Sequence, residues 1–252
     1  MKKITLFRWL NVLGFLGTLL INTLANALPI NGKNTGELSD AYPNLFVPAG
    51  LTFAIWGVIY LLLGMFAIYQ SKNGEEYVRK IGLWFGISSL ANILWIFMWH
   101  YEFVELSLLA MVILFISLLV IYLKLGIGKD KEISKKDKAF FHVPFSVYLG
   151  WITVATIANV TAVAVDRGWS GWGISEVMWT ILVIIVAYII TLLIQMTRKD
   201  IGYSLVISWA TLGIFLKRTD PEFTPQPLIA YTALVVSIVT LIGAIIVAIK
   251  KR

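Results

Sequence analysis

The chain has 252 residues, and 59% of them are hydrophobic while only 14% are charged, against about 25% charged residues in a typical soluble domain. Long apolar segments recur along its whole length and its mean hydropathy is +0.83, so a globule with one apolar core is excluded and an all-α polytopic membrane protein is predicted. The net charge is +7, and the basic residues behind it lie in short loops, where membrane topology explains them without a nucleic-acid partner. The chain has no Cys, which excludes disulfides, thiolate metal sites and Cys nucleophiles.

The first apolar segment, residues 5–27, has features of both a signal peptide and a membrane helix. Its basic start and the small residues at 25–27 fit a cleavable signal. Arg8, Asn11 and Asn22 interrupt the apolar core, however, and the segment is longer than an ordinary signal core. We therefore predict that it is retained as a helix.

Eight segments, including this one, read as membrane-spanning helices, each of which needs about 20 mostly apolar residues. The seventh is the shortest, which fits a helix that is tilted little or is partly re-entrant. The predicted spans are residues 5–27, 47–69, 80–100, 105–124, 140–165, 173–196, 202–216 and 228–249.

Lys and Arg are distributed unequally between the two sides of these spans. With the N-terminus inside, 17 of the 21 basic residues fall on the inside. Because cytoplasmic loops carry an excess of Lys and Arg, both termini are predicted to be cytoplasmic in a cell membrane. Topology and contact with anionic lipid explain the most basic loop, residues 124–138, with a partner site as the alternative. The basic residues expected outside are Lys33, Arg167, Lys217 and Arg218.

The predicted outer loops differ in composition from the inner ones. The first, residues 28–50, is rich in Asn, Gly, Pro and acidic residues and is long for a membrane-protein turn, which predicts an ordered loop or cap. The loop between the fifth and sixth spans places Trp169 and Trp172 among glycines, which is typical of the aromatic belt at a membrane interface.

The predicted spans contain no ionisable side chain near their centres. Such residues mark proton and ion pathways, so ion-coupled transport is not supported. The chain also lacks Walker A and HExxH motifs, which argues against ATP-driven transport and metalloprotease chemistry. With only His100 and His142, no metal site is expected, and we predict that the chain is not an enzyme.

Aromatic and amide side chains occupy the spans instead, and they form stripes. Residues three or four positions apart lie on one face of a helix, and three spans carry such a face. Helix packing through Trp and Asn and a ligand pocket with flat indole walls both explain the stripes, and periodicity alone slightly favours packing. The stripes are Trp56 and Tyr60; Asn92, Trp95 and Trp99; and Trp151, Ala155 and Asn159.

Three blocks of the sequence resemble one known family. Residues 148–159, YLGWITVATIAN, resemble the fifth-helix pattern Y-L-x-W-x-x-x-A-T-x-x-N of the TspO/MBR family, the translocator or tryptophan-rich sensory proteins. Residues 92–95, NILW, resemble its third-helix N-x-x-W, and residues 48–60 resemble the Pro-rich entry and Trp-Tyr signals of its second helix. The order and spacing of the blocks also match, over about residues 5–166.

The resemblance implies a five-helix bundle over residues 1–166 and an extension of about three transmembrane helices over residues 167–252. It also implies an apolar, aromatic pocket in the upper half of the bundle, capped by the first loop, for flat ligands such as porphyrins, haem and sterols. Val163 and Ala164 stand where the family usually has a Trp-Arg pair. Carried over by position, the pocket residues are Trp56, Tyr60, Asn92, Trp95, Trp151, Ala155 and Asn159.

The leading hypothesis is a membrane protein that binds a planar hydrophobic ligand, a tetrapyrrole such as porphyrin or haem, as a sensor or carrier without a required cofactor. The alternatives are a transporter for a small hydrophobic solute and an accessory membrane subunit without a ligand. Membrane lipid and a second copy of the chain, forming a homodimer, are the other partners considered. The last three spans could cover the lipid face of the bundle, form a dimer contact or add a second pocket around Trp209.

Overall fold

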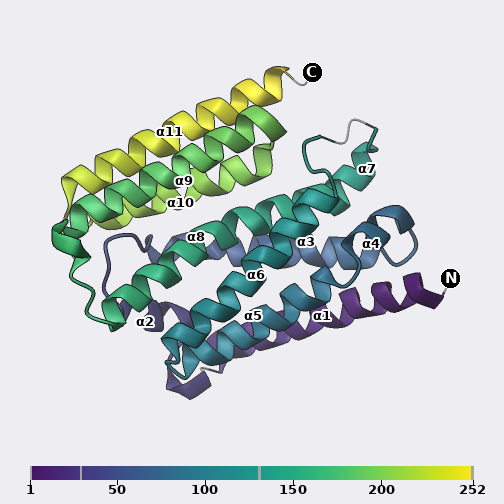
Figure 1. Cartoon of the computed structure of the whole chain (residues 1–252), viewed down its shortest axis with the longest axis horizontal. Helices are drawn as coiled ribbons and strands as arrows, with labels where there is room; N and C mark the ends of the chain where they lie inside the picture. The colour runs from purple at the N-terminus through teal and green to yellow at the C-terminus, as the bar shows by residue number, and fades with distance from the viewer. Residues whose placement is uncertain (1, 29, 130–131, 251–252) are drawn as a thin grey trace.

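The computed structural model describes residues 2–28, 30–129 and 132–250, and all regular structure in these residues is helical (Figure 1). The all-α prediction is therefore confirmed. Three of the basic residues counted above, Lys131, Lys251 and Arg252, lie outside the described residues.

Eight long helices carry the fold, joined by short helices and turns. The long helices are α1 (Lys2–Ala27), α3 (Ile55–Tyr69), α5 (Trp84–His100), α6 (Val104–Lys124), α8 (Val143–Asp166), α9 (Glu176–Arg198), α10 (Ile201–Thr219) and α11 (Pro227–Lys250). The short elements are η1 (Ile30–Gly32), α2 (Thr35–Asp40), η2 (Gly50–Ala54), α4 (Glu75–Ile81), α7 (Lys135–Asp137), η3 (Lys138–His142) and η4 (Gly171–Gly173).

The predicted third span is not one straight helix. α4 and α5 are bent by 53° relative to each other at a short break. Gly82 ends α4 with a φ of 58°, a conformation that glycine adopts without steric penalty. The predicted span of residues 80–100 therefore covers α5 but also includes the end of α4 and the break, because apolar composition alone does not report a turn.

Six helices of the described chain are long and apolar enough to cross a membrane, and the bent α4–α5 pair makes a seventh. α10 is a continuous helix of 19 residues, yet it is not among them. Its buried face carries Ser204, Ser208 and Thr211, and its last turn carries Lys217 and Arg218. These side chains lower the hydropathy of α10, so the eighth span stays a prediction.

Polar residues of α1 that interrupt its apolar run point into the bundle. The Asn11 amide donates to Oε1 of Gln70 at 3.0 Å, and the Asn22 amide donates to Oδ1 of Asn92 at 2.7 Å. A buried amide without a partner would cost about 1–3 kcal/mol. The pairs give both amide N–H groups an acceptor and bind α1 to its neighbours, while Oδ1 of Asn11 has no partner among the described residues.

The first five long helices and the last three share one apolar core. α8 packs against α10 (Figure 1), and buried residues of α10 such as Ile207 belong to the same cluster as Ile59 of α3. The close approach depends on Gly150, since a Cβ there would lie 3.0 Å from Cβ of Val206. Apolar packing is therefore continuous across residue 166, the predicted boundary.

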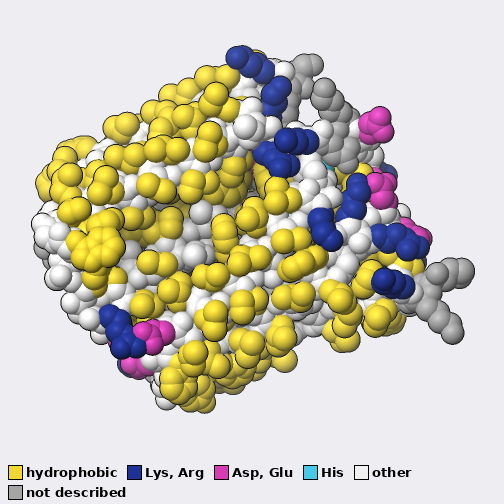
Figure 2. Space-filling view, in the orientation of Figure 1, with side chains coloured by type: hydrophobic (Ala, Val, Ile, Leu, Met, Phe, Trp, Pro, Cys, Tyr) yellow, Lys and Arg dark blue, Asp and Glu magenta, His cyan; other side chains and the backbone are white. Residues whose placement is uncertain are grey.

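The start of α1 and the end of α11 lie at the same end of the molecule (Figure 1). On the face that Figure 2 shows, most Lys and Arg side chains gather at that end, while apolar side chains cover the flanks. This distribution is what the charge count predicts for a protein whose termini lie on one side of a membrane. Which side that is stays a prediction.

Candidate functional site

Six of the seven predicted pocket residues line two adjoining cavities beneath the first loop. The smaller cavity has a volume of about 50 Å³ and the larger about 280 Å³. Thr35, Phe53, Trp56 and Trp95 line both, and we call the two together the aromatic pocket. The predicted residues on the smaller cavity are Trp56, Trp95, Trp151, Ala155 and Asn159, and those on the larger are Trp56, Tyr60 and Trp95.

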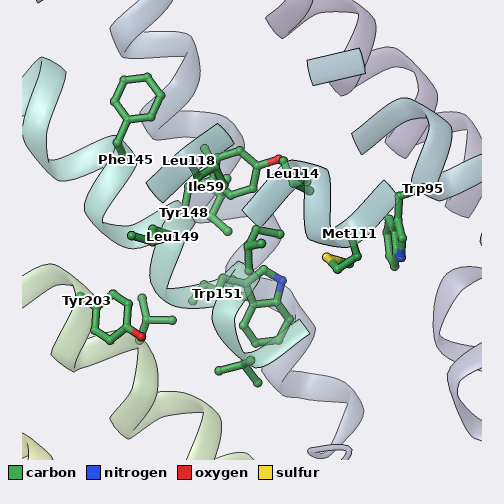
Figure 3. Close-up of a cluster of buried hydrophobic side chains, with 14 of the residues drawn as sticks. Ile59, Trp95, Met111, Leu114, Leu118, Phe145, Tyr148, Leu149, Trp151 and Tyr203 are labelled. Carbon is green, nitrogen blue, oxygen red and sulfur yellow. The ribbon is translucent and has the colours of Figure 1, made fainter. Parts of the chain in front are cut away.

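Flat aromatic rings form the walls of this pocket. Trp56 and Tyr60 stack at 5.6 Å between ring centroids, and Trp95 and Trp99 stack at 6.2 Å. Trp151 meets Trp56 edge-on at 6.2 Å. Trp95 from α5 and Trp151 from α8 belong to the buried cluster that Figure 3 draws. The stripes read from the sequence thus face one another across the bundle.

Two indole N–H groups in the pocket have no hydrogen-bond acceptor. Trp151 and Trp99 are only 2% and 6% exposed, and both line the smaller cavity. Neither Nε1 atom has a partner among the described residues. A buried donor without an acceptor is unfavourable by about 1–3 kcal/mol. These two donors are therefore available to a ligand that carries acceptor atoms.

Asn159 lines the smaller cavity, but its amide is already engaged. Its Oδ1 accepts from Nε1 of Trp95 at 3.0 Å, and its Nδ2 donates to Oγ of Ser107 at 3.0 Å. The side chain therefore connects α5, α6 and α8 and fixes the indole plane of Trp95. In this geometry Asn159 therefore orients the Trp95 indole, which forms part of the pocket wall.

Asn92 is the predicted pocket residue that lines neither cavity. It is fully buried, accepts from Asn22 and donates to the hydroxyl of Tyr148 at 3.1 Å. The amide thus joins α1, α5 and α8 below the pocket. Periodicity left open whether such a residue packs between helices or faces a ligand, and Asn92 packs between helices.

Replacing Asn159 with Ala is expected to destabilise the protein by about 1–3 kcal/mol, because Nε1 of Trp95 would lose its acceptor in a buried site. Thr156 is a suitable control on the same helix, since its hydroxyl bonds only to the Ile152 carbonyl one turn away. Thr156→Ala should change stability by less than about 0.5 kcal/mol. Thermal unfolding in detergent measures both, and equal shifts would contradict the network.

The first loop closes the pocket at one end, as the resemblance implied. Residues 30–49, the closing loop, contribute Ser39, Val47 and Pro48 to the smaller cavity. α2 within it begins with a capping box, in which Asn34 accepts from the backbone of Glu37 and Glu37 accepts from the backbone of Asn34. This local motif makes the loop ordered.

The closing loop is attached to the end of α5. Nδ1 of His100 lies 3.1 Å from the Ile30 carbonyl, and its Nε2 lies 3.1 Å from the hydroxyl of Thr35. Tyr42 packs against Trp99 at 5.5 Å. Burial and the nearby Glu102 carboxylate raise the pKa of Tyr42 above its usual value, so its phenol is neutral at physiological pH.

Two of the last three helices, α9 and α10, also attach the same loop. A carboxylate oxygen of Glu176 accepts from the Leu45 backbone at 3.1 Å, and the Gly213 carbonyl accepts from the Ala49 backbone at 3.0 Å. Nζ of Lys217 lies 2.9 Å from Asp40. The C-terminal helices therefore form part of the support for the pocket, a role that the sequence left open.

Lys217 should be coupled energetically to Asp40. Its side chain is 9% exposed while that of Asp40 is 60% exposed, so we expect a coupling energy of about 0.5–1 kcal/mol. A double-mutant cycle with Lys217→Met and Asp40→Asn, read by thermal unfolding, measures it.

The comparison pair for this cycle is Lys33 with Glu102, which also connects the closing loop but has both side chains more than 40% exposed. Its coupling should be smaller because water and salt screen it. A coupling at Lys217 no greater than at Lys33 would contradict a partly buried attachment between α10 and the loop.

Several lining residues were not among the predicted ones. Trp99 was not among the pocket residues carried over from the resemblance, but it stacks on Trp95 inside the pocket, and its place in the stripe with Asn92 and Trp95 was the signal that could have found it. Phe53 and the closing loop carry no periodic signal. Their position follows from contacts with helices far away in the sequence.

A family model described as TSPO-like protein matches residues 8–246, which include α9, α10 and most of α11. The comparisons with curated proteins and with solved structures found no match. The family match covers nearly the whole chain and confirms the resemblance carried by residues 148–159. Together with the apolar helices, it establishes that this chain is an all-α, multi-pass membrane protein of the TSPO-like family.

Proposed function

We propose that this protein binds a planar, largely apolar ligand of the porphyrin or haem type in the aromatic pocket, as a sensor or carrier. Family membership supports a ligand-binding or transport role in a membrane. The observation that carries the ligand class is the pair of indole donors, Trp99 and Trp151, which lack acceptors inside an aromatic wall. A flat ring system would lie against the indoles, and its polar edge would accept from them.

The pocket is closed in this structure, and its size defines what binding requires. Ligand pockets usually have volumes of about 300–1,000 Å³, whereas the two cavities have about 50 and 280 Å³. Phe53, Trp56 and Trp95 separate them. We propose that binding moves the closing loop and these rings so that the cavities merge.

The pocket supports binding in preference to hydrolytic chemistry. In the part of the chain that the structure describes, no Asp, Glu, His, Lys or Arg lines either cavity. General acid–base catalysis needs such groups within hydrogen-bond reach of the substrate. We therefore propose that the tetrapyrrole is a ligand of a non-enzymatic protein and that no cofactor is required.

Titration of the purified protein with protoporphyrin IX or haemin tests the proposal. We expect quenching of Trp fluorescence and a shift of the porphyrin absorption band at micromolar ligand, because the ring system would lie against several indoles. Absence of both signals at micromolar concentrations would exclude the tetrapyrrole assignment. Haemin-dependent stabilisation against heat gives an independent measurement.

A further inference from the structure

A larger groove of about 660 Å³ lies between α3, α8 and α10 and shares no lining residue with the aromatic pocket. We call it the basic groove. Apolar side chains line most of its length, and polar ones gather at one end. The apolar lining is Ala54, Ile55, Val58, Ile127, Val143, Val147, Ile201, Leu205, Val206 and Trp209, and the polar side chains are Lys138, His142, Ser146, Lys199 and Asp200.

The apolar part of the groove opens onto the flank of the molecule. Val58 of α3 is 51% exposed, and Leu205 and Trp209 of α10 are 45% and 37% exposed, although all three side chains are apolar. In a multi-pass protein, exposed apolar side chains on the flank of the helix bundle are suited to contact lipid chains. The groove is therefore accessible sideways from the bilayer.

Two of the described residues at the polar end are lysines, and one is an aspartate. Lys138 belongs to η3, and Lys199 ends α9 with a φ of 53°, a left-handed conformation that usually belongs to glycine. Asp200 is buried, and its Oδ1 accepts from the hydroxyl of Ser146 at 2.6 Å. Lys138, Lys199 and this carboxylate thus lie at the same end of the groove.

The dimensions of the groove match one leaflet of a bilayer. Along α10 it extends from Asp200 to Trp209, and nine residues at 1.5 Å each span about 14 Å. The hydrocarbon core of a bilayer is about 30 Å thick, so one leaflet accounts for about half of it. Lys138 begins η3, which directly follows α7, and Figure 1 shows α7 at the end of the molecule where most basic side chains gather in Figure 2.

We propose that the basic groove binds an anionic membrane phospholipid from the leaflet at the basic end of the molecule. Its phosphate lies between Lys138 and Lys199, and one acyl chain follows Leu205 to Trp209. The two lysines select an anionic head group, and the length and sideways opening select a lipid over a soluble anion. A lipid bound there would contact both the bundle and α10.

Lipid selectivity in nanodiscs tests the head-group site. Discs containing phosphatidylcholine and phosphatidylglycerol are prepared with the wild type, with Lys138→Gln/Lys199→Gln and with Lys135→Gln/Lys136→Gln, and retained lipids are counted by native mass spectrometry. A Lys near a membrane surface contributes about 1 kcal/mol toward anionic lipid, so the first variant should lose preference for phosphatidylglycerol by about tenfold or more.

The second variant removes the same charge from exposed lysines of α7 that do not line the groove, and it should change the preference by less than about twofold. Equal losses in the two variants would show a diffuse effect of surface charge and overturn the site. A wild type without any preference for phosphatidylglycerol would also overturn it.

Quenching by brominated lipid tests the acyl-chain site and does not depend on the lysine variants being stable. Bromine on the acyl chain of phosphatidylglycerol should quench the wild type more than bromine on phosphatidylcholine does. The excess should vanish in Trp209→Phe, because Trp209 is the one indole lining the groove among the described residues. An excess that persists in this variant would place the lipid elsewhere and overturn the proposal.

Discussion

Gly213→Val should destabilise the protein and weaken ligand binding together. A Cβ at this position would lie 2.0 Å from Oγ1 of Thr52 and 2.9 Å from its Cβ, so α10 and η2 would be forced apart. Inserting bulk into a packed interior typically costs about 1–3 kcal/mol. η2 leads directly into Trp56, and the Gly213 carbonyl accepts from Ala49. Thermal unfolding and haemin titration measure the two effects.

Gly57→Ala is the control, because it also adds a Cβ atom to a glycine within a helix. No atom lies within 4 Å of a Cβ placed at Gly57, and Ala has a higher helix propensity than Gly by about 0.8–1 kcal/mol. Its stability should therefore be unchanged or slightly higher. If Gly213→Val is tolerated as well as Gly57→Ala, the contact between α10 and η2 does not support the pocket.

Trp151→Phe should weaken porphyrin binding less than Trp151→Ala. Phe keeps a flat ring but loses the indole N–H that has no partner in the free protein. Loss of one hydrogen bond corresponds to about 0.5–1.5 kcal/mol, or about two- to tenfold in Kd. Ala also removes the ring that meets Phe53 and Trp56, and it should weaken binding by about 30-fold or more.

The porphyrin absorption band gives the Kd in each variant without depending on the number of Trp residues. Titrations well below the unfolding temperature are needed, since Trp→Ala in a core typically costs about 3–5 kcal/mol of stability. Trp172→Ala is the control, because Trp172 is 80% exposed on the outer loop and lines neither cavity. Equal Kd values for Trp151→Phe and Trp151→Ala would contradict a stacking role for this ring.

The aromatic stripes show how far helical periodicity alone predicts a site. Trp151, Ala155 and Asn159 were expected on one face of a helix, and all three line the smaller cavity. Helical periodicity predicts which side chains share one face of a helix, but it does not predict whether that face lines a cavity or packs against another helix. Asn92 was in the same kind of stripe as Trp95, and it contacts Asn22 and Tyr148 rather than a cavity.

The sequence by itself determined the class of the protein, its family and most helix bounds. These properties are local: apolar length defines a membrane helix, and a motif such as residues 148–159 is contiguous. The seven carried-over residues remain candidates for ligand contact, since only a bound ligand tests that role.

Tertiary structure decided how the pocket is closed and which helices support it. Lys217 meets Asp40 across 177 positions of sequence, and Trp209 donates to the Thr52 carbonyl across 157. No local pattern encodes contacts at such separations, because they depend on how α10 packs against α8. The free volume between the rings depends on the same packing, which is why the aromatic faces could be read from the sequence while the closed pocket and the basic groove could not.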